Sequence, residues 1–258
     1  MNATSPAVDP LFRACRYLYR LPLLGWHLLV HLPVLLLLLA VGEVGGRQVG
    51  HAALRWWARW FLRIFGMRVI REGLPLAGGT MFVANHVSWV DIVALHSQHM
   101  MGFIAKHEIR GWPLVGWLST HTETIYLRRG NADSLGGVMD EMATRLRAGR
   151  AVAAFPEGGT RGGLALGPFH ARIFTAAVAA DAPVQPVALC YGARCHAQSI
   201  VAFAPRENFL ANFVRMLGEP PRSARVCFLE PILHADQEGR RGIAQLARSR
   251  IENAMQSA

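Results

Sequence analysis

Charged side chains are scarce in this chain, and lysine is almost absent. Only 17% of the 258 residues are charged, whereas 52% are hydrophobic. An ordinary soluble domain has about 25% charged residues, so this composition predicts contact with a membrane. Lys106 is the single lysine, and arginine therefore supplies nearly all of the positive charge behind the formal net charge of +10.

This arginine excess favours polyanionic partners. Anionic lipid headgroups, the phosphates of coenzyme A and an acidic acyl carrier protein all fit such a surface. Nucleic acid is excluded as a partner because no recognition motif occurs and the aromatic residues cluster with apolar residues.

The four cysteines include no C-x-x-C pair, so the sequence predicts neither a zinc site nor a disulfide framework and fits a reducing compartment. The G-x-S-x-G turn of serine hydrolases is absent as well. A metallohydrolase built from His86, Asp91, Glu157 and His170 lacks any H-x-H or H-E-x-x-H spacing. We therefore expect no metal and no tightly bound cofactor.

An uncharged run from Leu21 to Gly42 has arginines on both sides. As a helix rising about 1.5 Å per residue, the run is long enough to cross a bilayer core. Pro33 divides it, and basic flanks on both sides oppose a single crossing under the positive-inside rule. We interpret the run as part of a kinked, re-entrant or interfacial helical hairpin that does not cross the membrane. One true transmembrane helix is the alternative.

The second arm of this hairpin extends from His51 to Gly66. Arg55, Arg59 and Arg63 recur every four residues, and three tryptophans lie between them. A basic stripe with bulky aromatic residues is typical of a helix in the headgroup layer, although a core helix with a solvated stripe shows the same spacing. Residues 1–66 are thus predicted to form a membrane-binding segment and residues 67–258 a catalytic domain.

The rest of the chain alternates between apolar runs and helical patterns, which predicts an α/β layered fold with a mostly parallel central sheet. Strands are expected near residues 80–84, 102–105, 124–128, 151–155, 184–190 and 225–229. Helices are expected near residues 89–98, 133–148, 170–180, 206–217 and 239–254.

The run Asn85-His86-Val87-Ser88-Trp89-Val90-Asp91 directly follows the first of these strands. With His86 in the turn and Asp91 in the first helical turn, the carboxylate can reach Nδ1. This contact fixes the tautomer and leaves Nε2 free to accept a proton, so that a substrate hydroxyl can act as the nucleophile. For the pair alone, a turn histidine and a helix cap would be the better explanation of the spacing.

Further stretches change this interpretation. They are Lys106-His107-Glu108 before Gly111-Trp112-Pro113, then Thr124–Arg129, Phe155–Arg161 and Val184–Val187. In this order and spacing they resemble the four motif blocks of the glycerolipid acyltransferase family, the lysophosphatidic acid acyltransferases and their relatives. The resemblance covers about residues 50–230.

The resemblance implies roles for the third block. Glu157 would order its loop or bind the acceptor, and Gly158 would let the backbone approach the substrate closely. Gly159 stands where the family has Thr, which shifts Thr160 and Arg161 by one position as candidate substrate-binding residues. A plain glycine-rich turn is the structural alternative.

The second block would bind phosphate. Arg129 matches a family arginine, and a guanidinium fork suits a phosphate monoester. Arg128 stands where the family often has Asp or Asn. Lys106 matches a family lysine near the acceptor site but could instead pair with Glu108.

Together these features predict a membrane-bound acyltransferase at the cytoplasmic face of a bacterial inner membrane. It would esterify the sn-2 hydroxyl of lysophosphatidic acid, using an acyl thioester of coenzyme A or acyl carrier protein. A lyso-ornithine lipid acyltransferase is the first alternative, and a non-catalytic lipid-binding membrane protein is the second. The sequence leaves the oligomeric state open.

Overall fold

A computed structural model describes residues 9–41, 43–44, 47–112, 115–127, 132–160, 162–163, 165–233 and 239–257. In these ranges a seven-stranded sheet has the order β3-β9-β8-β4-β7-β5-β6. All neighbouring pairs are parallel except β8 and β9. The strands are β3 (Met67–Glu72), β4 (Met81–Ala84), β5 (Gly102–Lys106), β6 (Ile125–Leu127), β7 (Val152–Ala154), β8 (Val184–Tyr191) and β9 (Arg222–Phe228).

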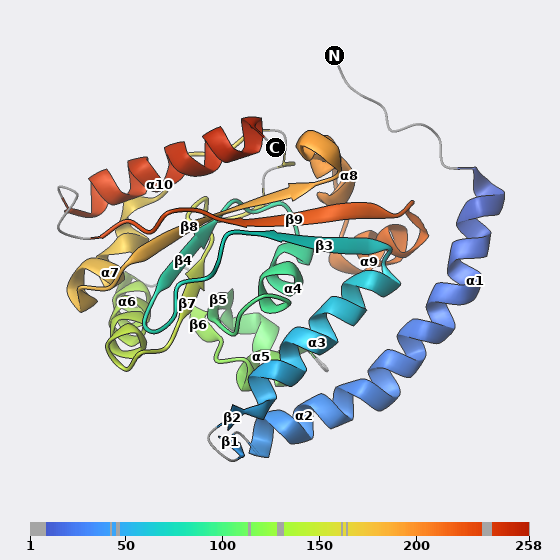
Figure 1. Cartoon of the computed structure of the whole chain (residues 1–258), viewed down its shortest axis with the longest axis horizontal. Helices are drawn as coiled ribbons and strands as arrows, with labels where there is room; N and C mark the ends of the chain where they lie inside the picture. The colour runs from blue at the N-terminus through green and yellow to red at the C-terminus, as the bar shows by residue number, and fades with distance from the viewer. Residues whose placement is uncertain are drawn as a thin grey trace.

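Helices cover both faces of this sheet (Figure 1). Side chains alternate along each strand, so Phe82 of β4 joins one hydrophobic cluster and its neighbour Val83 joins the other. One cluster includes α3 (Val49–Ile64), α4 (Val90–His96) and α9 (Phe209–Gly218). The other includes α6 (Ala132–Arg147), α7 (Thr175–Ala180) and α10 (Gly239–Gln256). The predicted layered α/β fold with a mostly parallel sheet is confirmed.

Some elements differ from the expected ones. Strand β3 was not expected, because three of its six residues are charged; it is an edge strand that pairs with β9 alone. Two short helices, α5 (Val115–His121) and α8 (Gln198–Val201), were also missed. The helix expected at 170–180 begins with a 3-10 turn, η3 (Ala171–Phe174), and so does not run as one α-helix.

The N-terminal helix is continuous from Pro10 to Val41. It consists of α1 (Pro10–Trp26), the π-helical turn η1 (His27–His31) and α2 (Leu32–Val41). Proline cannot donate a backbone hydrogen bond, and the wider turn just before Pro33 accommodates it, with the Leu32 N–H bonded to the His27 carbonyl. The helix therefore passes Pro33 without a break. Its length and composition alone would allow it to cross a membrane. Of its most apolar 18-residue stretch, 22% is buried.

The strands β1 (Glu43–Val44) and β2 (Arg47–Gln48) form the turn that leads into α3. Helix α3 then packs along α2, which confirms the helical hairpin (Figure 1). The hydrophobic cluster continues across the predicted boundary at residue 66, since Phe61 and Phe65 pack against Trp89 and Phe213.

Helix α1 is held to the catalytic domain by Arg20, which is almost fully buried. Its guanidinium donates to the backbone carbonyls of Leu217 (2.9 Å) and Glu219 (2.8 Å), at the carboxyl end of α9. A cation at this position also interacts favourably with the helix dipole. Because α1 contacts α9 and α2 contacts α3, both parts of the long helix lie against the domain.

The three arginines of the basic stripe on α3 differ in how exposed they are and in what they contact. Arg63 is exposed beside the exposed Trp60, as a headgroup-layer helix requires. Arg55 is half-buried, and the Arg59 guanidinium donates to the Ser97 carbonyl at 3.0 Å. Arg55 is thus partly packed within the protein, and Arg59, although exposed, also makes a hydrogen bond within it.

The structure joins Cys190 and Cys195 in a disulfide, so the expectation that the chain has none is wrong. Two cysteines five residues apart do not match a common disulfide framework. The two sulfurs meet because the chain turns back after β8, with Gly192, Arg194 and Cys195 all at positive φ. That left-handed turn is a backbone feature that cysteine spacing does not reveal.

We expect the apolar face of the N-terminal helix to hold the protein to membranes in 1 M salt, because salt screens charges but not hydrophobic burial. Leu29 and Leu37 are 79% and 64% exposed, so replacing both with Glu should release much of the protein without disturbing its core. Flotation on liposomes of anionic and neutral lipid measures this binding.

Leu74 is 70% exposed in the loop after β3 and supplies the matched control. Leu74→Glu should float like the unaltered protein. Release of the unaltered protein by salt alone would show that the attachment is electrostatic, contrary to this expectation.

Candidate active site

Three neighbouring strands, β4, β7 and β8, carry the site at their carboxyl ends. His86 follows β4, Glu157 follows β7, and Tyr191 is the last residue of β8. The carboxyl edge of a parallel sheet is where α/β proteins place their ligands. Because these strands are adjacent, residues far apart in the sequence meet within one hydrogen-bonded network.

Asn85 fixes the start of the histidine loop. Its side-chain amide donates to the Leu189 carbonyl at 3.0 Å and accepts from the Leu189 N–H at 2.8 Å. The side chain thereby imitates one residue of strand pairing between β4 and β8 and satisfies buried backbone groups. The chain is held in register until it reaches His86.

The carboxylate of Asp91 is fully buried in the first turn of α4. Oδ2 accepts from His86 Nδ1 (2.7 Å), Val87 N–H (2.6 Å) and Ser88 N–H (2.9 Å). Oδ1 accepts from the Tyr191 hydroxyl (2.5 Å). A buried charge is tolerated only when it is fully hydrogen-bonded, and these four donors meet that requirement. The predicted contact between His86 and Asp91 is confirmed.

The two ring nitrogens of His86 differ in their hydrogen bonding. Nδ1 faces a carboxylate, which only accepts hydrogen bonds, so the neutral ring carries its proton there. Within the described residues nothing hydrogen-bonds to Nε2. The ring stacks on the Phe155 ring, with 3.9 Å between the ring centroids and 11° between the ring planes. The His86 side chain is 17% exposed. Nε2 is thus available as a proton acceptor for a substrate.

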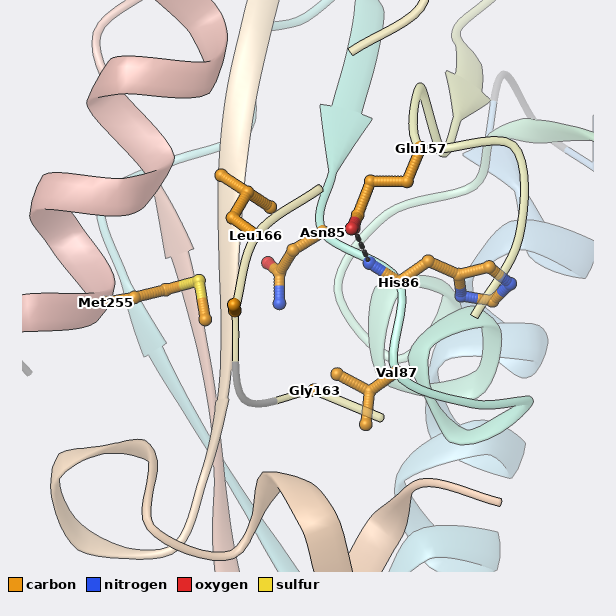
Figure 2. Close-up of a pocket in the computed structure, with 8 residues that line it drawn as sticks. Asn85, His86, Val87, Glu157, Gly163, Leu166 and Met255 are labelled. Atoms are coloured by element: carbon orange, nitrogen blue, oxygen red, sulfur yellow. Dashed lines mark hydrogen bonds between the residues drawn. The ribbon is translucent and has the colours of Figure 1, made fainter. Parts of the chain in front are cut away.

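Glu157 supports the backbone of the histidine loop (Figure 2). Its Oε1 accepts from the His86 N–H and its Oε2 from the Gly167 N–H, both at 2.8 Å. The residue is only 3% exposed. Of the two roles expected for Glu157, the structure shows loop ordering, and acceptor binding stays a prediction.

The structure shows less of the other residues that were expected to bind substrate. Gly158 is at φ 74°, so the loop after β7 needs its glycine, and Thr160 is exposed in the same loop. The backbone of Lys106 ends β5, where it pairs with Leu127 of β6, but its side chain lies outside the described part of the structure. Arg129 and Arg161 also lie outside the described residues.

A small cavity lies behind the histidine loop, lined by Asn85, Glu157, Leu166 and Met255 (Figure 2). Its volume of about 10 Å³ is that of a single water molecule, and the His86 ring points away from it. The cavity therefore belongs to the scaffold of the site. Within the described ranges, no group of three or more His, Cys, Asp or Glu side chains could hold a metal ion.

Sequence reasoning missed Asn85, Tyr191 and Phe155 as parts of this network. Phe155 and Tyr191 each close an apolar run, where an aromatic side chain is typical of a core. Asn85 lay within the recognised motif, but its partner Leu189 lies more than a hundred residues away.

The chain is similar to known proteins in both sequence and fold. Residues 52–190 match the acyltransferase family, and the chain belongs to it. It is 35% identical to a lyso-ornithine lipid O-acyltransferase of Pseudomonas aeruginosa, over 69% of each chain. It is 32% identical to the protein of the same name in Brucella abortus, over 76% of this chain and 79% of that one.

A second kind of relative is the 1-acyl-sn-glycerol-3-phosphate acyltransferase of Neisseria gonorrhoeae, 36% identical over 49% of each chain. The fold matches the crystal structure of the 1-acyl-sn-glycerophosphate acyltransferase PlsC of Thermotoga maritima. The TM-score is 0.75, with 18% identity over 96% of each chain. At that identity the likeness concerns the fold alone.

Glu157→Gln should destabilise the histidine loop. One oxygen becomes an NH2 group that faces a backbone N–H, which leaves a buried donor unpaired and costs about 1–3 kcal/mol. Thermal unfolding in detergent measures the loss, and acyl transfer should fall with it because His86 follows the displaced N–H.

Glu141→Gln is the matched control, since Glu141 is 45% exposed and its partner among the described residues is Arg145 on its own helix. An exposed pair of this kind contributes about 0.5 kcal/mol or less. Equal melting temperatures for the two variants would remove the structural role assigned to Glu157.

Proposed function

We propose that this protein transfers an acyl group from a thioester to the hydroxyl of a lyso-lipid at the membrane surface, with His86 as the general base. The observation that carries the proposal is the His86–Asp91 pair, whose open Nε2 lies at the carboxyl edge of the sheet. Membership in the acyltransferase family supplies the class of reaction.

The proposed reaction needs no covalent enzyme intermediate. Nε2 of His86 accepts the proton of the lipid hydroxyl while the oxygen attacks the carbonyl carbon of the thioester. The tetrahedral intermediate collapses, the C–S bond breaks, and the imidazolium returns the proton to the leaving sulfur. Asp91 stabilises the imidazolium between these steps. Such an orienting carboxylate must be buried and fully hydrogen-bonded, as Asp91 is with its four donors.

The donor is proposed to be an acyl thioester of coenzyme A or acyl carrier protein. Both carry phosphate, and the arginine-rich chain with its charge of +10 suits either. Arg129, Arg161 and Lys106 are the proposed cations for phosphate or carboxylate groups of the substrates.

For the acceptor, we favour lyso-ornithine lipid. The relatives of that name match over 69% and 76% of this chain, whereas the glycerol-3-phosphate relative matches over 49%. The third block also departs from the glycerolipid pattern at Gly159. This preference reverses the order of the two acceptors expected from the motifs. Arg129 matches a family arginine suited to binding phosphate. It therefore supports 1-acyl-sn-glycerol 3-phosphate as the second candidate acceptor.

A non-catalytic lipid-binding role is less consistent with the site. A protein that only binds lipid has no use for a buried carboxylate that orients a half-open histidine, yet the whole network is intact here. We further propose that the protein acts at the cytoplasmic face of the membrane, where both thioester donors are made.

The test is acyl transfer from a labelled thioester, in detergent, to lyso-ornithine lipid and separately to 1-acyl-sn-glycerol 3-phosphate. We expect kcat/KM to be higher for lyso-ornithine lipid. His86→Ala should lose about 10²–10⁴-fold in rate with either acceptor, because general-base catalysis contributes that much.

His121→Ala is the matched control, since among the described residues the His121 side chain hydrogen-bonds to the carbonyl and stacks on the ring of Trp117 of its own helix. It should keep the full rate. No labelled product from either acceptor, or near-normal turnover by a folded His86→Ala variant, would refute the proposed function.

A further inference from the structure

We propose that Tyr191 is a positioning residue for the acyl transfer, acting through Asp91 to set the orientation and the basicity of His86. This inference rests on the proposed function, since it assigns a role within the same site. The feature that carries it is the hydrogen bond across the sheet from the Tyr191 hydroxyl to Oδ1 of Asp91.

The two oxygens of Asp91 are held in different ways. Oδ2 accepts from His86 and from two backbone N–H groups of the histidine loop, which are all local contacts. Among the described residues, Tyr191 alone donates to Oδ1, and it does so from β8, a hundred residues along the chain. The only torsion that turns the carboxylate plane is the one about the Cβ–Cγ bond, and the contact at Oδ1 holds it from the opposite side of the group. The second contact fixes the plane of the carboxylate and thereby the direction of the imidazole.

Tyr191 remains a donor throughout the working range of pH. Its side chain is 1% exposed, and burial together with the charge of Asp91 raises the pKa of Tyr191 well above its ordinary value of 10. The phenol therefore keeps its proton, and the carboxylate it faces can only accept.

Tyr191 is itself anchored independently of the histidine loop. Its N–H donates to Gln198 Oε1 at 3.1 Å, and its carbonyl accepts from the Ala197 N–H at 2.9 Å. The amide of Gln198 in turn donates to the Leu189 carbonyl at 2.8 Å. The disulfide from Cys190 to Cys195 closes the same turn. The hydroxyl is thus presented from a rigid strand end, as a positioning residue requires.

The hydroxyl should also affect how strongly His86 holds a proton. A donor to Oδ1 draws negative charge away from Oδ2, so the phenol weakens the attraction between Asp91 and the imidazolium. The titratable groups that face His86 in the described structure are Asp91 from α4, Tyr191 through Asp91, and Glu157 at its backbone N–H. Without the hydroxyl, Asp91 should hold the imidazolium more tightly, and His86 should become a free base only at higher pH.

The experiment compares Tyr191→Phe with the unaltered full chain in detergent. Phenylalanine keeps the ring and its packing and removes only the O–H. We expect kcat to fall about tenfold, the rate equivalent of one charge-assisted hydrogen bond. KM should change by less than about twofold, and the acidic limb of the pH–rate profile should move up by about half a unit. Tyr17→Phe, which loses a hydroxyl contact to the Val214 carbonyl on α9, should leave all three unchanged.

A second measurement does not depend on turnover. Diethyl pyrocarbonate reacts with histidine only in its neutral imidazole form, and peptide mass spectrometry reports the rate of this reaction at His86. Tyr191→Phe should slow this modification about twofold at pH 6 and leave it unchanged at pH 8. If the unaltered protein acylates neither lipid but this shift is present, the proposed function fails and the link from Tyr191 to His86 stands. Unchanged kcat, or an unshifted acidic limb together with an unshifted modification rate, would overturn the role proposed for Tyr191.

Discussion

The buried carboxylate of Asp91 is the interaction on which the site depends. It is fully inaccessible to solvent, and an isolated charge in that position would be strongly unfavourable. Four donors offset this penalty, and they come from the histidine loop and from the end of β8. The loop conformation, the tautomer of His86 and the junction between β4 and β8 are therefore fixed by one anion.

The topology of the sheet makes this network possible. Strand β4 lies between β7 and β8, so the loops after all three converge. From one side Glu157 holds the His86 N–H, and from the other Asn85 ties the loop to Leu189. Phe155, beside Glu157, provides the surface on which the imidazole lies. Meanwhile α3 packs against Trp89 in the same loop region, which connects the N-terminal hairpin to the catalytic loop through a common core.

Local patterns predicted much of this from the sequence. The apolar runs correctly indicated six strands of a mostly parallel sheet, and the spacing of His86 and Asp91 correctly indicated their contact. Edge strand β3 was missed because its charged residues obscure the alternation of apolar and polar residues that indicates a strand. The disulfide of Cys190 and the role of Tyr191 were missed because each depends on where the chain turns after β8. These contacts are set by the backbone turn and by tertiary packing, which no local pattern contains.

The account centres on direct attack by the lipid hydroxyl, with His86 as base and no acylated protein. Ser88, the nearest alternative nucleophile, is fully buried, and its N–H and hydroxyl both take part in the turn before α4. The most direct test is intact mass spectrometry of the purified protein incubated with the labelled thioester alone. The account predicts an unmodified mass at every time point. A stoichiometric acyl adduct on Ser88 or on a cysteine, formed and then discharged by the acceptor lipid, would contradict it.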